Sequence, residues 1–143
     1  MKSFLKFLQF GFIPRSSDLA LLVLRVWLGV SLLALHGWAK LVSFSSMAGR
    51  FPDPLGIGPK GSLALAIFAE VLCAALLALG LATRFAALVL IVLLAVAFLV
   101  VHGRALSGAG SGEMAFIYLA GFVTVFLAGP GRYSVDAKLG GAV

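Results

Sequence analysis

Four apolar stretches follow one another along this 143-residue chain, separated by turn-forming or charged residues. They run near residues 19–39, 62–82, 85–102 and 113–129. A bilayer core takes about 20 apolar residues per helix, so each stretch predicts a membrane-spanning helix. We therefore predict an all-α fold, a transmembrane four-helix bundle formed by residues 18–139.

Residues that favour turns mark the ends of these helices. In the segment GLATRF, Gly80 can end the second helix and Thr83 can cap the third. A link this short makes the second and third helices antiparallel neighbours. Pro130, between two glycines, ends the fourth helix. Ser17 and Asp18 are the expected caps of the first helix.

The two ends of the chain fall outside the predicted bundle. Residues 1–17 combine Lys2 and Lys6 with phenylalanine and leucine, a composition typical of a helix that lies in the membrane interface. Lys6 interrupts the apolar run and no small-residue cleavage site follows it, so a signal peptide is not expected. Residues 140–143 are predicted to form a short tail.

The composition is that of a membrane protein: 62% of the residues are hydrophobic, 11% are charged and the mean hydropathy is +1.16. Soluble domains are about half apolar and about a quarter charged. The net charge of +6 would suit a nucleic-acid partner if the basic residues formed a stripe, but they are scattered singly. They are expected instead to contact membrane lipids and to set the topology.

The topology follows from the distribution of lysine and arginine between the two ends of the helices. More of them lie on the side that holds both termini than on the other side, which predicts that both termini are cytoplasmic. The larger group is Lys2, Lys6, Arg15, Arg84, Arg132 and Lys138, and the smaller group is Lys40, Arg50, Lys60 and Arg104.

The first helix carries three basic side chains that are unfavourable on a lipid-facing surface. Arg25 and His36 are eleven positions apart, which places them within about 20° of each other on a regular helix. Lys40 follows His36 at i+4 and lies on nearly the same stripe. Because a charge that faces lipid is costly, this stripe is expected to face the bundle interior or a water-filled cavity.

Other polar residues belong to the same half of the bundle. His36 and Lys40 end the first helix, and His102 ends the third. Glu113 starts the fourth helix, and antiparallel helices bring these four residues to one face of the membrane. Glu70 lies about 12 Å deeper, at 1.5 Å per residue. The sequence therefore predicts a polar pocket between the helices in this half of the bundle.

Each of these residues also has a purely structural interpretation. Lys40 can extend to the lipid headgroups, and His102 can simply end a helix at the interface. Glu113 can complement the dipole of the helix that it starts. Arg25 and Glu70, both well inside their helices, can form a structural ion pair.

The candidate chemistry is binding of a small polar ligand. A metal site lacks a local ligand pair such as H-x-x-x-H, and haem would consume both histidines. The chain has one cysteine, which excludes a thiol relay within the chain. A quinone fits better, because its carbonyl oxygens can accept hydrogen bonds from Arg25, His36 or Lys40. A carboxyl group, Glu70 or Glu113, would then handle a proton.

The order of these residues resembles the DoxX family of small four-span membrane proteins. The likeness covers residues 18–139 and runs through LRVWLGVSLLALHGWAKL, FAEVLCAALLALGLATRFAAL, VAFLVVHGRA and EMAFIYLAGFVTVFLAGPGRYSVDAKL. The matching positions include Arg25, His36, Lys40, Glu70, His102 and Glu113.

The resemblance implies redox chemistry at a bacterial inner membrane, since related subunits occur in terminal quinol oxidases and thiosulfate:quinone oxidoreductases. The chain is then expected to be a quinone-linked oxidoreductase subunit, or an accessory of an oxidative-stress system, that works with redox partner proteins. In that role Glu70 is the buried acid tuned by Arg25. His102 and Glu113 line the mouth of the pocket, and the loop 43–61 partly covers it.

Two other functions fit the same features of the sequence. The chain can be a non-enzymatic membrane scaffold, in which the polar residues fix helix register and the loop 43–61 recruits a partner protein. It can also be a small-solute or proton transporter, because charges inside a membrane often mark a transport path. A bound ligand would distinguish the redox function from the scaffold, and flux in liposomes would identify a transporter.

Overall fold

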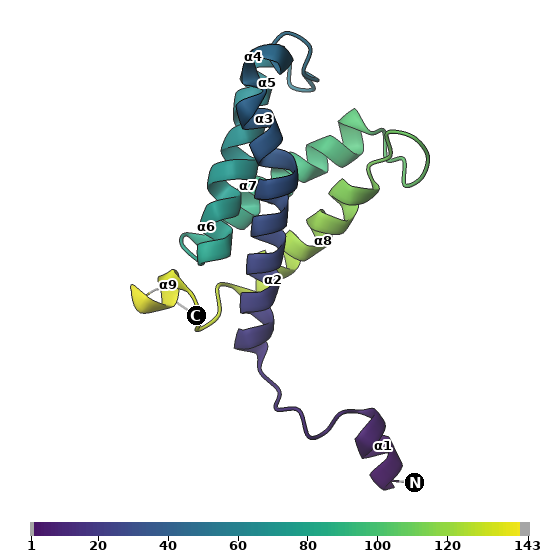
Figure 1. Ribbon diagram of the computed structural model, residues 1–143, viewed down its shortest axis with the longest axis vertical. Helices are drawn as coiled ribbons and strands as arrows, with labels where there is room; N and C mark the ends of the chain where they lie inside the picture. Colours follow the sequence, from purple (N-terminus) through teal and green to yellow (C-terminus); the bar gives the residue numbers. More distant parts are fainter. Residues whose placement is uncertain (1, 141–143) are drawn as a thin grey trace.

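The computed structural model describes residues 2–140, and every regular element within them is a helix (Figure 1). Three continuous helical runs are long and apolar enough to cross a membrane: Ser17–Val42, Pro59–Leu79 and Thr83–Val101. A fourth apolar helix, α8 (Glu113–Ala128), has 16 residues and is about 24 Å long at 1.5 Å per residue. All four agree with the predicted stretches to within one helical turn.

Each of the three long runs contains a π-helical segment, in which one extra residue is accommodated in a turn. The first run consists of α2 (Ser17–Leu32), η1 (Leu33–Gly37) and α3 (Trp38–Val42). The second consists of α5 (Pro59–Ile67), η2 (Phe68–Cys73) and α6 (Ala74–Leu79), and the third of α7 (Thr83–Val96) and η3 (Ala97–Val101). Three shorter helices are α1 (Lys2–Leu8), α4 (Phe44–Met47) and α9 (Val135–Lys138).

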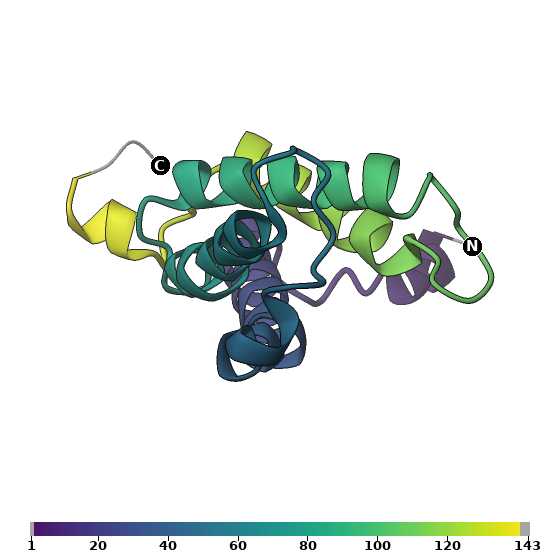
Figure 2. The same cartoon turned by 90° about the horizontal axis from the view of Figure 1, so that it is seen from above.

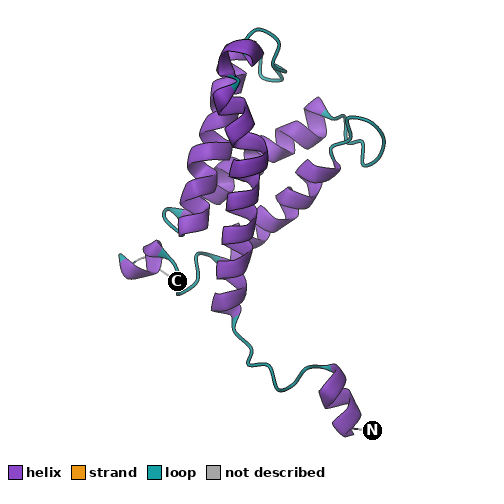
Figure 3. Cartoon of the chain, viewed as in Figure 1, coloured by secondary structure: helices purple, strands orange, loops and turns teal. Residues whose placement is uncertain are grey.

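The four long helices form two antiparallel hairpins (Figure 1, Figure 3). The first run packs along the second, and α7 packs along α8. The hairpins also contact each other, through α2 against α8 and through η2 and α6 against α7, so the helices close into a bundle. Seen from above, α7 and α8 run across the first hairpin (Figure 2). The hairpins meet near α9 and diverge toward α3 and α4 (Figure 1).

Small residues let the helices of the first hairpin pack backbone against backbone. A Cβ added to Gly29 would lie 2.6 Å from the carbonyl oxygen of Ala74, and one added to Gly37 would lie 2.6 Å from that of Glu70. Such close packing favours helix association in lipid, where the hydrophobic effect does not drive it. Both glycines therefore fix the distance between the first and second runs.

Arg25 joins three parts of the chain at the end where the hairpins meet. Its side chain is fully buried, and its guanidinium donates to the carbonyl oxygens of Leu77 (3.2 Å), Ala78 (3.4 Å) and Tyr133 (2.8 Å). The last carbonyls of a helix have no partner within the helix, so Arg25 satisfies the end of the second run. Gly80 then turns the chain with a φ of 72°, and a Cβ there would collide with the guanidinium. The predicted helix end at Gly80 is confirmed.

Asp136, on α9, caps the third run from a distant part of the sequence. Its carboxylate accepts hydrogen bonds from the backbone N–H groups of Ala82 (2.7 Å) and Thr83 (2.9 Å) and from the Thr83 hydroxyl (2.7 Å). Burial alone would raise the pKa of this carboxyl group, but the hydrogen bonds and the charge of Arg25 outweigh burial and lower the pKa below its ordinary value. The prediction that Thr83 caps the third helix is therefore wrong, because the cap is Asp136.

The first run also begins differently from the prediction. Ser16, rather than Ser17 or Asp18, caps it, and the Ser16 hydroxyl oxygen accepts a hydrogen bond from the N–H of Leu19 at 3.1 Å. The Asp18 carboxylate instead accepts a hydrogen bond from the backbone N–H of Arg132 at 2.9 Å. Asp18 thus attaches the C-terminal segment to the first run.

The segments outside the bundle are short. Helix α1 forms within the predicted segment 1–17 and stands apart from the bundle (Figure 1). The side chains of Lys2 and Lys6 are not among those described, and the location of α1 in the membrane interface stays a prediction, as does the cytoplasmic side of both termini. The predicted tail, 140–143, lies outside the described residues except for Gly140.

Replacing Arg25 by lysine should destabilise the bundle. An ammonium keeps the charge but lacks the planar fork that reaches both the second run and the C-terminal segment, so buried carbonyls lose their donor. We expect the free energy of unfolding in detergent to fall by about 1–3 kcal/mol. The conservative change Arg132→Lys, at an exposed position, is the matched control and should shift it by no more than about 0.5 kcal/mol. Equal stability of the two variants would contradict the role given to Arg25.

Candidate functional site

Each of the three π-helical segments carries or adjoins a polar residue that the sequence singles out. Segment η1 holds His36, η2 holds Glu70, and η3 ends one residue before His102. The extra residue of a π segment rotates all that follows by about 100°, so it redirects side chains relative to a regular helix. π segments are rare in proteins and often occur at functional sites.

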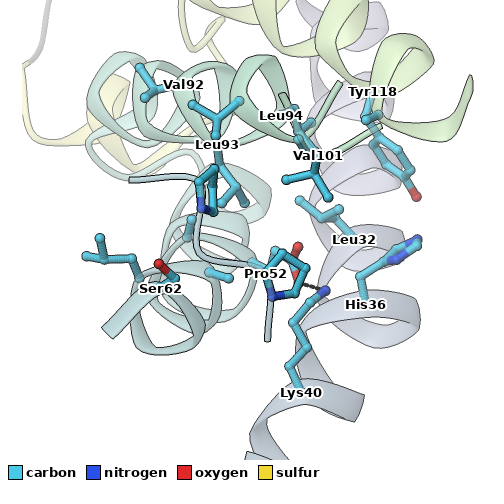
Figure 4. Close-up of a pocket in the computed structure, with 18 of the residues that line it drawn as sticks. Leu32, His36, Lys40, Pro52, Ser62, Val92, Leu93, Leu94, Val101 and Tyr118 are labelled. Atoms are coloured by element: carbon cyan, nitrogen blue, oxygen red, sulfur yellow. Dashed lines mark hydrogen bonds and ion pairs between the residues drawn. The ribbon is translucent and has the colours of Figure 1, made fainter. Parts of the chain in front are cut away.

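A cavity of about 610 Å³ lies between the two hairpins (Figure 4). Its walls come from all four long helices and from the loop that joins the first run to the second. Ligand sites are typically cavities of about 300–1,000 Å³ with mainly apolar walls and a few polar groups. This cavity has that character, and its polar residues are His36, Lys40, Ser62, Glu70, His102, Ser111 and Tyr118.

Lys40 and Glu70 form an ion pair in the cavity wall (dashed line in Figure 4). The Lys40 ammonium donates to Oε2 of Glu70 at 2.5 Å, and the two side chains are only 19% and 9% exposed. Gly37 lies directly against the Glu70 backbone, which brings the two helices close enough for the pair to form. An ammonium has three donors, so Lys40 can neutralise Glu70 and still donate to a second acceptor.

His36 offers a buried nitrogen to the same cavity. Its Nε2 atom has no hydrogen-bond partner in the described part of the chain. The ring packs edge to face on Tyr118, with centroids 6.1 Å apart and planes at 84°. The Tyr118 hydroxyl donates to the hydroxyl of Ser31 at 2.8 Å. A buried polar atom without a partner is unfavourable, so His36 is suited to a ligand that supplies one.

His102 is held in the cavity wall by the loop that follows it. Its Nδ1 lies 2.7 Å from the carbonyl oxygen of Gly110. A carbonyl oxygen only accepts, so Nδ1 donates, and in the neutral ring Nε2 is then left as an acceptor. Gly112 packs against the Cβ of His102, and a Cβ on Gly112 would lie 2.9 Å from it. The loop thereby fixes both the position and the tautomer of the neutral ring.

The loop between the first and second runs covers one side of the cavity, as expected from the sequence. It contributes apolar side chains to the lining, and these belong to Phe51, Pro52, Pro54 and Leu55.

Asp53 holds this loop in place. Its Oδ1 accepts from the hydroxyl of Ser62 (2.6 Å) and the N–H of Ile57 (3.1 Å), and its Oδ2 accepts from the N–H of Gly58 (2.8 Å). The hydrogen bond from Ser62 is the largest cause that lowers the pKa of Asp53 below its ordinary value; the backbone donors add to it and burial opposes it. Because Ser62 belongs to α5, Asp53 connects the loop to the cavity wall.

Four of the six predicted site residues share this cavity: His36, Lys40, Glu70 and His102. They provide an ammonium, a carboxylate and two imidazoles, a set that can donate to a carbonyl oxygen and exchange a proton with a hydroxyl. Within residues 2–140, no three His, Cys, Asp or Glu side chains gather in a group that could hold a metal ion.

Arg25 does not belong to the cavity. It lies at the opposite end of the bundle, and Glu70 pairs with Lys40, so the ion pair of Arg25 with Glu70 that the sequence left open does not form. The reason is depth: Gly37 packs against Glu70 and Gly29 packs against Ala74, so in this antiparallel hairpin Arg25 lies level with the end of the second run. Glu70 is seven residues before Leu77, about 10 Å along the helix at 1.5 Å per residue.

Glu113 also lies outside the cavity lining, contrary to the prediction that it lines the mouth. It is exposed at the first position of α8, where its charge complements the helix dipole. Helix α8 faces the cavity with Met114, Ala115 and Tyr118, which follow the spacing of three to four residues of one helix face. Glu113 does not lie on that face of the helix.

Three polar residues of the lining were not predicted, and they are Ser62, Ser111 and Tyr118. Tyr118 lies against His36, and Ser62 binds Asp53 at the base of the loop. The sequence carries no clear signal for Ser62, because it precedes Glu70 by eight positions, which turns it about 80° away from Glu70 on a regular helix. For Tyr118 the signal would be the rotation of α8, which the sequence does not fix.

Replacing Asp53 by asparagine should loosen the loop over the cavity. The amide has one acceptor oxygen and no charge, so it cannot hold all three donors equally well. We expect faster backbone hydrogen exchange at residues 55–58, measured by mass spectrometry. Asp18→Asn removes a carboxylate at the other end of the bundle and should leave exchange in this loop unchanged.

The same loop should loosen in the unaltered protein at acidic pH. The pKa of Asp53 is depressed in the folded state. The stability that its carboxylate gives the loop is therefore fully present above the ordinary aspartate pKa of about 3.9. It is lost as the pH falls through the lower, folded value. If neither the Asp53→Asn substitution nor a fall through this pH range speeds hydrogen exchange in the loop, the Asp53 carboxylate does not hold the loop in place.

Comparison with known proteins identifies the family of the chain. A family model described as DoxX matches residues 20–103, which include Arg25, His36, Lys40, Glu70 and His102. No curated protein and no solved structure matches the chain. Because the matched residues make up more than half of the chain and contain most of its membrane-crossing helices, the chain belongs to the DoxX family and is a multi-pass membrane protein.

Proposed function

We propose that this chain binds a quinone, or a small ligand with similar carbonyl oxygens, in the cavity between its hairpins. It serves as a subunit or accessory of a redox system in a bacterial inner membrane, and a partner protein exchanges electrons with the ligand. The observation that carries this proposal is the convergence of His36, Lys40 and Glu70 on one largely apolar cavity.

Two groups orient the ligand in this proposal. Lys40 donates a hydrogen bond to a carbonyl oxygen while it stays paired with Glu70. His36, whose Nε2 has no partner in the described part of the chain, supplies a second hydrogen bond. The apolar walls keep water away from both contacts, and hydrogen bonds are electrostatically stronger in such surroundings than in water.

Glu70 is positioned to hold a proton next to the ligand. A quinone takes up two protons with two electrons when it is reduced, so its site needs groups that hold and pass protons. Glu70 lies in the cavity wall, where its Oε2 accepts a hydrogen bond from Lys40. His102, with Nε2 free to accept in the neutral ring, is a second proton acceptor in the same wall.

A non-enzymatic scaffold is the second candidate function. It is favoured by the fact that Lys40 and Glu70 pair with each other, and that both terminal nitrogens of Arg25 donate to backbone carbonyls, without any ligand. In a scaffold the polar residues would fix the helix register, and loss of Glu70 would reduce stability without releasing a ligand.

Quinone content is the test that separates the two functions. We would purify the protein in mild detergent, quantify quinones per chain by mass spectrometry, and measure the Kd for added quinone. Glu70→Gln and His36→Ala should each weaken binding at least about tenfold, or about 1.4 kcal/mol.

The matched control is Glu113→Gln, which neutralises an exposed carboxylate outside the cavity and should bind as the original protein does. Size-exclusion profiles establish that all variants are folded. Undiminished binding in both cavity variants would contradict the site. A protein that neither carries nor binds quinone would favour the scaffold.

A further inference from the structure

The apolar part of the cavity reaches the lipid-facing surface between the second and third runs. Leu65, Phe68 and Val92 line the cavity, yet they are 49%, 41% and 56% exposed. Other apolar residues of the lining, Leu32, Ala66 and Leu94, are at most 5% exposed, so contact with the cavity alone leaves little exposed area. The three exposed side chains therefore also reach the outer surface of the bundle, which lipid surrounds. The cavity therefore has an opening on the side of the bundle. We call this opening the lateral slot, and its residues are Leu65, Phe68, Val89, Val92, Leu93 and Val96.

The lateral slot lies at a depth where hydrocarbon surrounds the protein. Leu65 is six residues from the start of the second run and Val92 is nine residues from the end of the third. At 1.5 Å per residue they lie about 9 Å and about 14 Å from those ends. The hydrocarbon core is about 30 Å thick, so the slot opens into lipid tails rather than into the aqueous phase.

His36 and Tyr118 lie on a different side of the cavity from the lateral slot. Figure 4 shows Val92 and Leu93 on one side and His36 and Tyr118 on the other. Apolar side chains of the loop, among them Phe51 and Pro52, cover a further part of the lining. The cavity is thus polar at one end and apolar toward the bilayer, which matches a ligand with a polar head and an apolar tail.

We propose that the ligand is a lipid-soluble amphiphile that enters sideways from the bilayer and leaves its hydrocarbon tail in the lateral slot. This inference rests on the proposed function and specifies its ligand as a quinone with an alkyl or isoprenoid tail. The ring meets Lys40 and His36, and the tail passes between the second and third runs. Lipid and slot are equally apolar, so the tail adds little affinity, and the slot's role is to admit it.

The test compares two quinones that share a ring. One is a dimethoxy-methyl-benzoquinone without a tail, and the other carries a ten-carbon alkyl chain on the same ring. Tryptophan in the slot, in Val92→Trp or Leu65→Trp, should obstruct the tail and leave the ring site open. We expect the tailed quinone to bind at least about tenfold more weakly to either variant, and the tail-free quinone to bind as before.

The chain provides a matched control for each variant. Val100 and Leu72 are 59% and 50% exposed on the same helical runs, close to the values for Val92 and Leu65, and neither lines the cavity. Val100→Trp and Leu72→Trp should therefore bind both quinones as the original protein does. All proteins are compared in the same detergent, so partition of the tailed quinone into micelles cancels.

The outcomes separate this inference from the proposed function. If tryptophan in the slot affects both quinones equally, or neither, the lateral slot is overturned while the ring site stands. If the tail-free quinone does not bind the original protein, the proposed function fails and this inference fails with it.

A second measurement requires no variant. The ten-carbon chain is given a terminal diazirine, the complex is irradiated, and the labelled peptides are identified by mass spectrometry. Adducts within residues 65–68 or 92–96 are expected from a tail in the slot. Adducts confined to residues 51–55 would place the tail under the loop and overturn the inference.

Discussion

A fully buried guanidinium is the constraint on which the rest of this fold depends. Arg25 lies within a helix that crosses the membrane, where an unsatisfied charge is costly. Its acceptors are carbonyls at the end of the second run and at Tyr133, near the C-terminus. These groups surround one guanidinium only when the three segments meet at one point. The need to satisfy Arg25 therefore fixes how the hairpins join.

Because the two hairpins are joined at the end that contains Arg25, they can separate at the other end. Asp136 caps the third run and Asp18 holds the C-terminal segment, so further contacts reinforce the end that Arg25 organises. The hairpins diverge away from this end (Figure 1), and the cavity lies between them. The π-helical segments η1 and η2 then direct His36 and Glu70 toward it. The contacts that hold the hairpins together and the candidate site thus lie at opposite ends of the bundle.

The sequence predicted the features that depend on length and depth. Apolar length alone located the four helices, and antiparallel order alone placed His36, Lys40 and His102 at one level. It did not predict helix rotation, because a π segment leaves no mark in apolar periodicity. The ion pair of Arg25 with Glu70, which the sequence allowed, fails for a different reason: the first hairpin aligns Arg25 with Leu77 and Ala78, beyond Glu70.

Contacts between distant parts of the sequence were also beyond prediction. The carboxylate that caps the third run, Asp136, lies more than fifty positions after the residues it binds, Ala82 and Thr83. Local capping rules pointed to Thr83 because they consider only neighbouring residues. The position of Glu113 off the cavity face likewise depends on how α8 is turned against the other helices.

Infrared difference spectroscopy of a bound quinone with isotope-labelled carbonyl groups would detect hydrogen bonds from Lys40 and His36 to the ligand. A carbonyl that accepts a hydrogen bond from Lys40 or His36 absorbs at lower frequency than the same carbonyl in an apolar solvent. We expect this lower frequency in the original protein. It should be partly lost in Lys40→Met and in His36→Ala, and it should be retained in the exposed control Lys60→Met. A carbonyl band that stays at its apolar-solvent frequency in the original protein, or that none of the variants changes, would show that Lys40 and His36 do not bind the quinone ring.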